Sequence, residues 1–268
     1  MRRNADPRPS RATARACLAA ALVLAASMPA HATTLVVLVT GRAVIVGADS
    51  MRTLATGGRE TVCKINHRDG VVFGFAGAVN AERFDAATVT AAEIAKGGTL
   101  AEQASRTAEA LQAGLVAHFK GRDVDRTRRE LVEAHRGRPV TGFIAGLVEG
   151  RPQVWLVMVR AEPAPDGVTL TTHVDQVDTK RPDRAVFVSP QHPDVIAHAR
   201  ERLGHKPRAS VDDLVGAAAE LVAMDVALDE QRAPKARKSG PPTTVAVLDD
   251  DGFRLVMPGE CTARAQLR

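Results

Sequence analysis

The chain has 268 residues, with 36 Lys and Arg against 31 Asp and Glu, and only 3% of its residues are aromatic. The first 32 residues carry five of the Arg and one Asp, so 31 basic and 30 acidic residues remain beyond them. This near-neutral balance, with few aromatic side chains for base stacking, argues against nucleic-acid binding.

Residues 1–32 have the three-part pattern of a cleavable signal peptide. Five Arg are followed by an apolar run at 16–26, and the segment ends in Ala30-His31-Ala32, an A-x-A cleavage site. The apolar run is shorter than the roughly 20 residues that a bilayer core requires. We therefore expect export to the periplasm or the extracellular space, a mature chain that begins at Thr33, and no membrane association after processing.

Two cysteines, Cys63 and Cys261, belong to the expected mature chain. An oxidising compartment outside the cytoplasm would allow them to form a disulfide. The sequence alone leaves two alternatives open, a bridge between them or two separate thiols.

The mature chain is predicted to begin with four strands, at 33–40, 43–48, 61–66 and 71–76. The first two are apolar runs separated by Gly41-Arg42, a pattern typical of a hairpin that is buried on both faces. The other two are separated by Asp69-Gly70, a dipeptide that favours tight hairpin turns.

Helices are predicted next, at 80–96 and 100–120. Thr99 and Glu102 have the spacing of a capping box, which marks the start of the second helix. The charged stretch at 123–134 is expected to form a short surface helix or a loop.

The remaining elements repeat the same order of strands, helices and strands. We predict strands at 140–148, 153–160, 168–174 and 185–188, helices at 194–203 and 210–231, a loop at 233–242, and a last hairpin of 245–248 and 253–256. Runs of strands that alternate with paired helices predict one α+β domain, 33–268, with two packed sheets and helices outside them.

Cleavage after Ala32 would give Thr33 a free α-amine. A threonine hydroxyl is a weak nucleophile until a base removes its proton, and the α-amine of the same residue can be that base. Its reference pKa of about 7.7–8.0 leaves part of it neutral at physiological pH. The sequence therefore indicates an amino-terminal nucleophile.

Four motifs carry a resemblance to a known family: Thr33-Thr34, Gly47-Ala48-Asp49-Ser50, Thr61-Val62-Cys63-Lys64-Ile65 and Gly74-Phe75-Ala76-Gly77. In order and spacing they resemble the proteasome β-subunit family of N-terminal nucleophile (Ntn) hydrolases, including its bacterial two-ring homologue. Asp49 stands 16 residues after Thr33, as the family's catalytic aspartate does. Lys64 comes one residue earlier than the usual family lysine, which a one-residue deletion around 54–58 would explain.

The resemblance implies a four-layer αββα sandwich of two antiparallel sheets, and it implies roles for four residues. Thr33 would be the nucleophile of a threonine protease or amidohydrolase, Lys64 would favour the alkoxide, and Asp49 would hold Lys64 in place. The backbone N–H of Gly77 would bind the oxyanion. A peptide or small amide would be the substrate, and the family analogy implies a homo-oligomer. An exported chain has no access to cytoplasmic ATP, so no ATP-dependent unfoldase is expected as a partner.

The second half of the chain departs from the family pattern. The supporting serine of the family is best matched by Ser189, which lacks the usual flanking glycines. Ser239-Gly240 matches a later Ser-Gly pair, but Ala236 stands where the family has an aspartate. This puts the proton relay in doubt, although not the nucleophile.

Other interpretations stay open. Asp49 and Lys64 could be a surface ion pair at a strand end, the chain could be a non-proteolytic amidohydrolase, or it could be an inactive assembly module of the same fold. The seven histidines beyond residue 32 show no H-x-x-x-H spacing, and we predict neither a metal site nor a cofactor.

Overall fold

The computed structural model describes residues 34–53, 58–81, 84–179, 185–188, 192–204, 209–232 and 239–261. In this part of the chain, two five-stranded antiparallel sheets are combined with helices in an α+β fold. The expected signal peptide, 1–32, lies outside the described residues.

The first sheet has the strand order β12-β1-β2-β13-β14. Its strands are β12 (Ala185–Val188), β1 (Leu35–Val39), β2 (Val44–Asp49), β13 (Thr243–Asp249) and β14 (Gly252–Met257). The predicted hairpin of β1 and β2 is confirmed, and β13 pairs with the other edge of β2, with Thr243 opposite Asp49. Every residue of β1 and β2 is buried, as their continuous apolar sequence predicts.

The second sheet has the strand order β11-β10-β9-β6-β5. Its strands are β11 (Gly167–Gln176), β10 (Arg151–Ala164), β9 (Val140–Val148), β6 (Val71–Gly77) and β5 (Asn66–Arg68). The turn between β5 and β6 is at Asp69-Gly70, where both residues have positive φ, 50° and 78°. This is the conformation that a type I′ hairpin turn requires.

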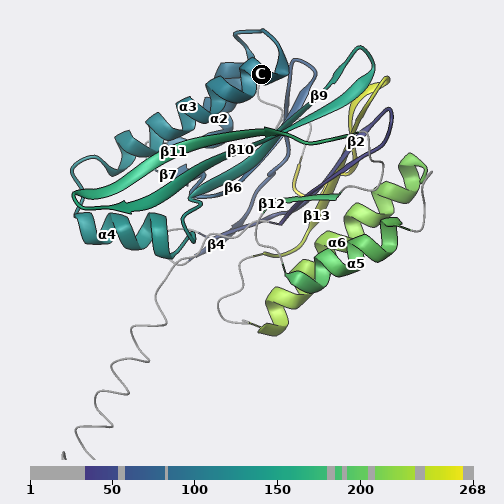
Figure 1. Cartoon of the computed structure of the whole chain (residues 1–268). Coiled ribbons are helices and arrows are strands. Elements are labelled where there is room, and N and C mark those ends of the chain that lie inside the picture. Colours follow the sequence, from purple (N-terminus) through teal and green to yellow (C-terminus); the bar gives the residue numbers. More distant parts are fainter. Residues whose placement is uncertain are drawn as a thin grey trace, which may run out of the picture.

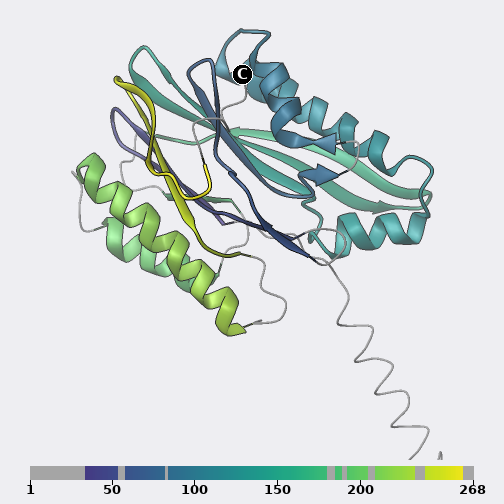
Figure 2. The same ribbon diagram turned by 180° about the vertical axis from the view of Figure 1, so that it is seen from behind.

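One pair of helices packs against each sheet (Figures 1 and 2). Helices α2 (Ala86–Ile94) and α3 (Leu100–Phe119) cover the second sheet, and α5 (Pro193–Gly204) and α6 (Val211–Arg232) cover the first. The Thr99–Glu102 capping box is present at the start of α3. The charged stretch after α3 forms α4 (Val124–Arg128) and a π-helical turn (Arg129–Glu133), of which α4 lies next to β11.

Three apolar clusters account for this arrangement. Leu35 and Val37 of β1 meet Val72 and Phe143 of the second sheet in a core between the two sheets. The alternate residues of β1, such as Val36, face α5 and α6 instead. The outer face of the second sheet packs on α2 and α3. A strand buried on both faces therefore separates two cores, as the unbroken apolar runs predict.

Two predicted elements are wrong in extent. The predicted strand at 61–66 is divided between β4 (Arg59–Thr61), which pairs with β3 (Met51–Thr53), and β5 of the second sheet. The residues between β4 and β5 connect the two-stranded sheet of β3 and β4 to the second five-stranded sheet. The helix predicted to start at residue 80 begins at Ala86, because β7 (Asn80–Ala81) and β8 (Phe84–Asp85) pair before it and Asp85 caps it.

A disulfide joins Cys63 to Cys261, with 4.7 Å between the two Cα atoms. The sequence left this pairing open, and the structure resolves it as a bridge. The bond ties the segment that carries Lys64 to the region that follows the last strand, 198 residues away in sequence.

Candidate active site

A buried ion pair of Asp49 and Lys64 lies at the centre of the candidate site. The Lys64 Nζ is 2.7 Å from Asp49 Oδ1, and the two side chains are 6% and 0% exposed. Asp49 ends β2, and Lys64 belongs to the crossing segment between β4 and β5. The interpretation of these residues as a surface ion pair is therefore wrong, and the predicted contact between them is confirmed.

Three backbone N–H groups also donate to the Asp49 carboxylate. The N–H of Thr34 donates to Oδ1 at 2.8 Å, and those of Met51 and Gly240 donate to Oδ2 at 3.1 and 3.0 Å. The carboxylate thus fixes the start of β1, the start of β3 and the segment before β13 relative to one another. Its lone pairs are well satisfied, as a buried charge requires.

Burial dominates the electrostatics of this pair. It raises the pKa of the Asp49 carboxyl, while the Lys64 charge and the N–H donors oppose that shift. Burial also lowers the pKa of the Lys64 ammonium, against the attraction of Asp49, and the charge of Arg52 lowers it further. Burial thus disfavours the charged form of each group, whereas the mutual attraction of Asp49 and Lys64 favours it.

Local packing explains why Lys64 lies here. A Cβ at Gly74 would be 2.9 Å from the Lys64 carbonyl oxygen, so only glycine lets β6 pass this close to the Lys64 backbone. The N–H of Val62 donates to the Ser50 carbonyl at 2.7 Å, and the neighbouring Cys63 is held by its disulfide. These contacts, rather than a strand ladder, hold the crossing segment.

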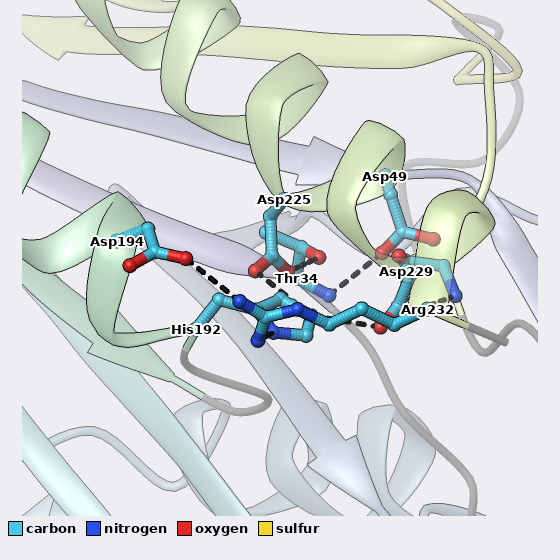
Figure 3. Close-up of polar contacts among 8 residues, drawn as sticks. Thr34, Asp49, His192, Asp194, Asp225, Asp229 and Arg232 are labelled. Atoms are coloured by element: carbon cyan, nitrogen blue, oxygen red, sulfur yellow. Dashed lines mark hydrogen bonds and ion pairs between the residues drawn. The ribbon is translucent and has the colours of Figure 1, made fainter.

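A second carboxylate holds the side chain of Thr34 (Figure 3). The Thr34 Oγ1 donates to Asp225 Oδ2 at 2.5 Å, and Asp225 is 1% exposed. Asp225 reaches this position because α6 packs closely on β2. A Cβ at Gly47 would lie 3.1 Å from both the Ala218 carbonyl oxygen and the Val222 side chain, so this glycine allows the close approach.

A third group of polar residues extends from Asp225 along α6. Asp229 accepts two hydrogen bonds from Ser239, from Oγ at 2.7 Å and from the backbone N–H at 3.0 Å. His192 Nε2 lies 2.9 Å from Asp229 Oδ1, while Nδ1 lies 2.9 Å from Arg232, which in turn donates to Asp194 at 2.7 Å. Because an arginine can only donate, Nδ1 accepts and Nε2 carries the proton that points to Asp229.

The Ser239 side chain has a carboxylate partner that the resemblance did not indicate. In the sequence, Ala236 stands where the family has an aspartate, which puts the proton relay in doubt. The structure supplies a carboxylate to Ser239 from Asp229, ten residues earlier in the chain. Ala236 itself lies outside the described residues.

The other predicted site residues have separate outcomes. Gly77 ends β6, three residues beyond Gly74, with a φ of 101° that disfavours other residues, and a Cβ there would clash with the Pro139 carbonyl oxygen. Its assigned role as the oxyanion donor stays a prediction. Thr33 and Ser189 lie outside the described residues.

Three residues of these polar groups, Asp225, Asp229 and His192, belong to none of the motifs found in the sequence. A signal for the two aspartates exists on α6, where the buried residues follow a helical spacing: Leu214, Ala217, Ala218, Leu221, Val222, Asp225 and Asp229. Acidic residues that continue an apolar stripe are expensive to bury unless they have partners. No comparable signal marks His192, which precedes α5 as an isolated histidine.

No protein-family model matches the chain, and neither does any curated protein. Among the described residues, no group of three or more His, Cys, Asp or Glu is arranged to hold a metal ion. In the same part of the chain, none of the helices has the length and apolar character needed to span a membrane.

Proposed function

We propose that the processed chain is an exported threonine-type N-terminal nucleophile hydrolase that cleaves peptide or other amide bonds. The observation that carries this proposal is the buried Asp49–Lys64 pair, whose carboxylate accepts a hydrogen bond from the N–H of Thr34. That N–H belongs to the peptide bond that Thr34 shares with Thr33. Consecutive Cα atoms are about 3.8 Å apart, so a nucleophile at position 33 would be one residue from the ion pair.

The chemistry follows from these groups. The Thr33 hydroxyl attacks the amide carbonyl while its proton passes to the free α-amine, directly or through water. The Lys64 ammonium lowers the energy of the developing alkoxide, and the Gly77 N–H binds the oxyanion. The leaving amine takes the proton as the C–N bond breaks, which leaves an ester on Thr33. Water then hydrolyses this ester by the same route and regenerates the hydroxyl.

The arrangement of the elements supports the same proposal. A helix pair outside each of two facing antiparallel sheets is the order expected for the four-layer αββα fold of Ntn hydrolases. The disulfide is compatible with export to the periplasm or the extracellular space, where such bonds persist. By analogy with proteasome-like assemblies, we further propose that the protein forms a homo-oligomer without an ATP-dependent unfoldase.

The test is hydrolysis by the processed protein recovered from exporting cells. Wild type, Thr33→Ala and Thr33→Ser are compared on a pool of fluorogenic peptide amides, after amino-terminal sequencing shows that each begins at residue 33. We expect Thr33→Ala to lose at least about 1,000-fold in kcat and Thr33→Ser to retain measurable turnover. Equal rates for wild type and Thr33→Ala would refute the proposal. Turnover of small amides alone, with peptides ignored, would favour a non-proteolytic amidohydrolase on the same chemistry.

A further inference from the structure

Asp225 is a buried carboxylate that the proposed reaction does not use. It is 1% exposed, and its Oδ2 accepts the hydrogen bond from the Thr34 hydroxyl. Its Oδ1 has no hydrogen-bond partner among the described residues. A buried carboxylate with one oxygen unsatisfied destabilises a fold, so a role beyond packing has to be considered.

Titratable and charged groups lie on two sides of Asp225. From the segment that precedes α5, His192 Nε2 lies 3.8 Å from Asp225 Oδ1, and Asp194 reaches the same histidine through Arg232. From α6 itself, Asp229 adds a second negative charge one turn further along. Burial raises the pKa of Asp225 to about 6, and Asp229 adds to the shift, whereas the Thr34 hydroxyl and His192 oppose it.

Two carboxylates on different elements hold Thr34. From β2, Asp49, itself paired with Lys64, binds its backbone N–H. From α6, Asp225 binds its side-chain hydroxyl. Two bonds to different atoms of one residue fix its rotation as well as its position, which one bond cannot do. The Thr34 N–H lies in the plane of the peptide bond that leads to residue 33, so holding the rest of Thr34 as well restricts the orientation of that plane.

We propose that Asp225 is a positioning residue for the amino-terminal nucleophile, because it holds the second threonine by its hydroxyl while Asp49 holds the same residue by its amide. This inference rests on the proposed function and adds to it a residue outside the motifs by which the sequence resembles the proteasome family. A misplacement of about 1 Å can cost roughly 100-fold in rate, so a contact one residue from the nucleophile can control turnover.

The experiment compares kcat and KM of processed wild type, Thr34→Val, Thr34→Ser and Asp225→Asn. Valine has the shape of threonine without its hydroxyl, and serine restores the hydroxyl. Thr90→Val is the matched control, because Thr90 is equally buried and donates to the Ala86 carbonyl in α2, on the other helix pair. Thermal unfolding of every variant separates loss of fold from loss of turnover.

We expect Thr34→Val to lower kcat by about 10- to 100-fold with KM changed by less than about threefold. Thr34→Ser recovers most of kcat, and Thr90→Val changes the melting temperature without changing kcat. Asp225→Asn lowers kcat about 10-fold at pH 8. This loss narrows towards pH 5, because a charge-assisted hydrogen bond weakens once the wild-type carboxyl is itself protonated.

The outcomes separate the two proposals. This inference is wrong if Thr34→Val and Asp225→Asn keep the wild-type kcat. It is also wrong if they lower kcat equally at pH 5 and pH 8 and Thr34→Ser does not restore it. In both cases Asp225 is a structural residue, and the proposed function stands. If Thr34→Val does not fold, the pH dependence of Asp225→Asn decides. If processed wild type has no hydrolysis above the Thr33→Ala background, the proposed function and this inference both fall.

Discussion

Removal of the Lys64 charge should destabilise the fold strongly, whatever the protein does. Lys64→Met keeps the length of the side chain but leaves Asp49 with three N–H donors and no cation. The lysine and aspartate side chains are 6% and 0% exposed, so water cannot replace the lost partner. Breaking a buried pair in this way costs about 3–5 kcal/mol.

Arg254→Met is the matched control. The Arg254–Asp249 pair has the same 2.7 Å separation, but its arginine is 44% exposed, so its loss should cost less than about 1 kcal/mol. With a urea m-value near the upper end of about 1–3 kcal/mol/M, Lys64→Met should shift the unfolding midpoint by more than about 1 M.

Urea unfolding is followed by the fluorescence of Trp155, the single tryptophan of the chain. The double variant Asp49→Asn/Lys64→Met should lose less than the sum of the two single variants, by about 1–3 kcal/mol, because each single variant leaves one group unpaired. A cost for Lys64→Met no larger than that for Arg254→Met, or additive losses in the double variant, would contradict the account of this pair.

Three further predictions concern groups around the site. Burial raises the pKa of Asp225 in the folded protein to about 6, so the protonated carboxyl stabilises the fold at low pH and this stabilisation is lost as the pH rises. Between pH 4.5 and pH 7.5, the free energy of unfolding of wild type should fall by about 2 kcal/mol relative to that of Asp225→Asn. Parallel stability curves for the two proteins would contradict this. Loss of the disulfide, by Cys63→Ser/Cys261→Ser or by reductant, should lower the free energy of unfolding in urea by about 2–4 kcal/mol. Reductant should not change the stability of the double variant. If reductant does not change the stability of wild type either, that would be evidence against the bridge. Gly47→Ala should lower the free energy of unfolding by about 1–3 kcal/mol and reduce turnover, because its Cβ pushes α6 away from β2. Gly41→Ala, whose Cβ would meet nothing within 4 Å, should change neither quantity. Equal melting temperatures for the two variants would refute the close-packing argument.

Much of the fold could be predicted from local patterns. The apolar runs of β1 and β2 and the turn at Asp69-Gly70 act through neighbouring residues, so the sequence carries them directly. The segment 61–66 was misassigned because its conformation depends on distant partners. Val62 bonds to Ser50, and Cys63 is bridged to Cys261, and these contacts override a β-type local preference.

The residues of the candidate site also differ in whether a local sequence motif marks them. Asp49 and Lys64 were identified because both belong to short motifs in the first half of the chain. Asp225 was not, since its partner Thr34 lies 191 positions away and no short motif joins them. Asp229 was not identified either, because it lies ten residues before Ser239 and no short motif joins the two.

The most direct test of the central claim is the mass of the processed protein after reaction with a peptide epoxyketone. Such a reagent can bond to both the hydroxyl and the free α-amine of an amino-terminal threonine, so it reports both groups at once. We predict one adduct per chain, mapped to the peptide that begins at Thr33, and none in Thr33→Ala. An unlabelled wild type that begins at residue 33, or an adduct mapped elsewhere, would contradict the assignment of an N-terminal nucleophile.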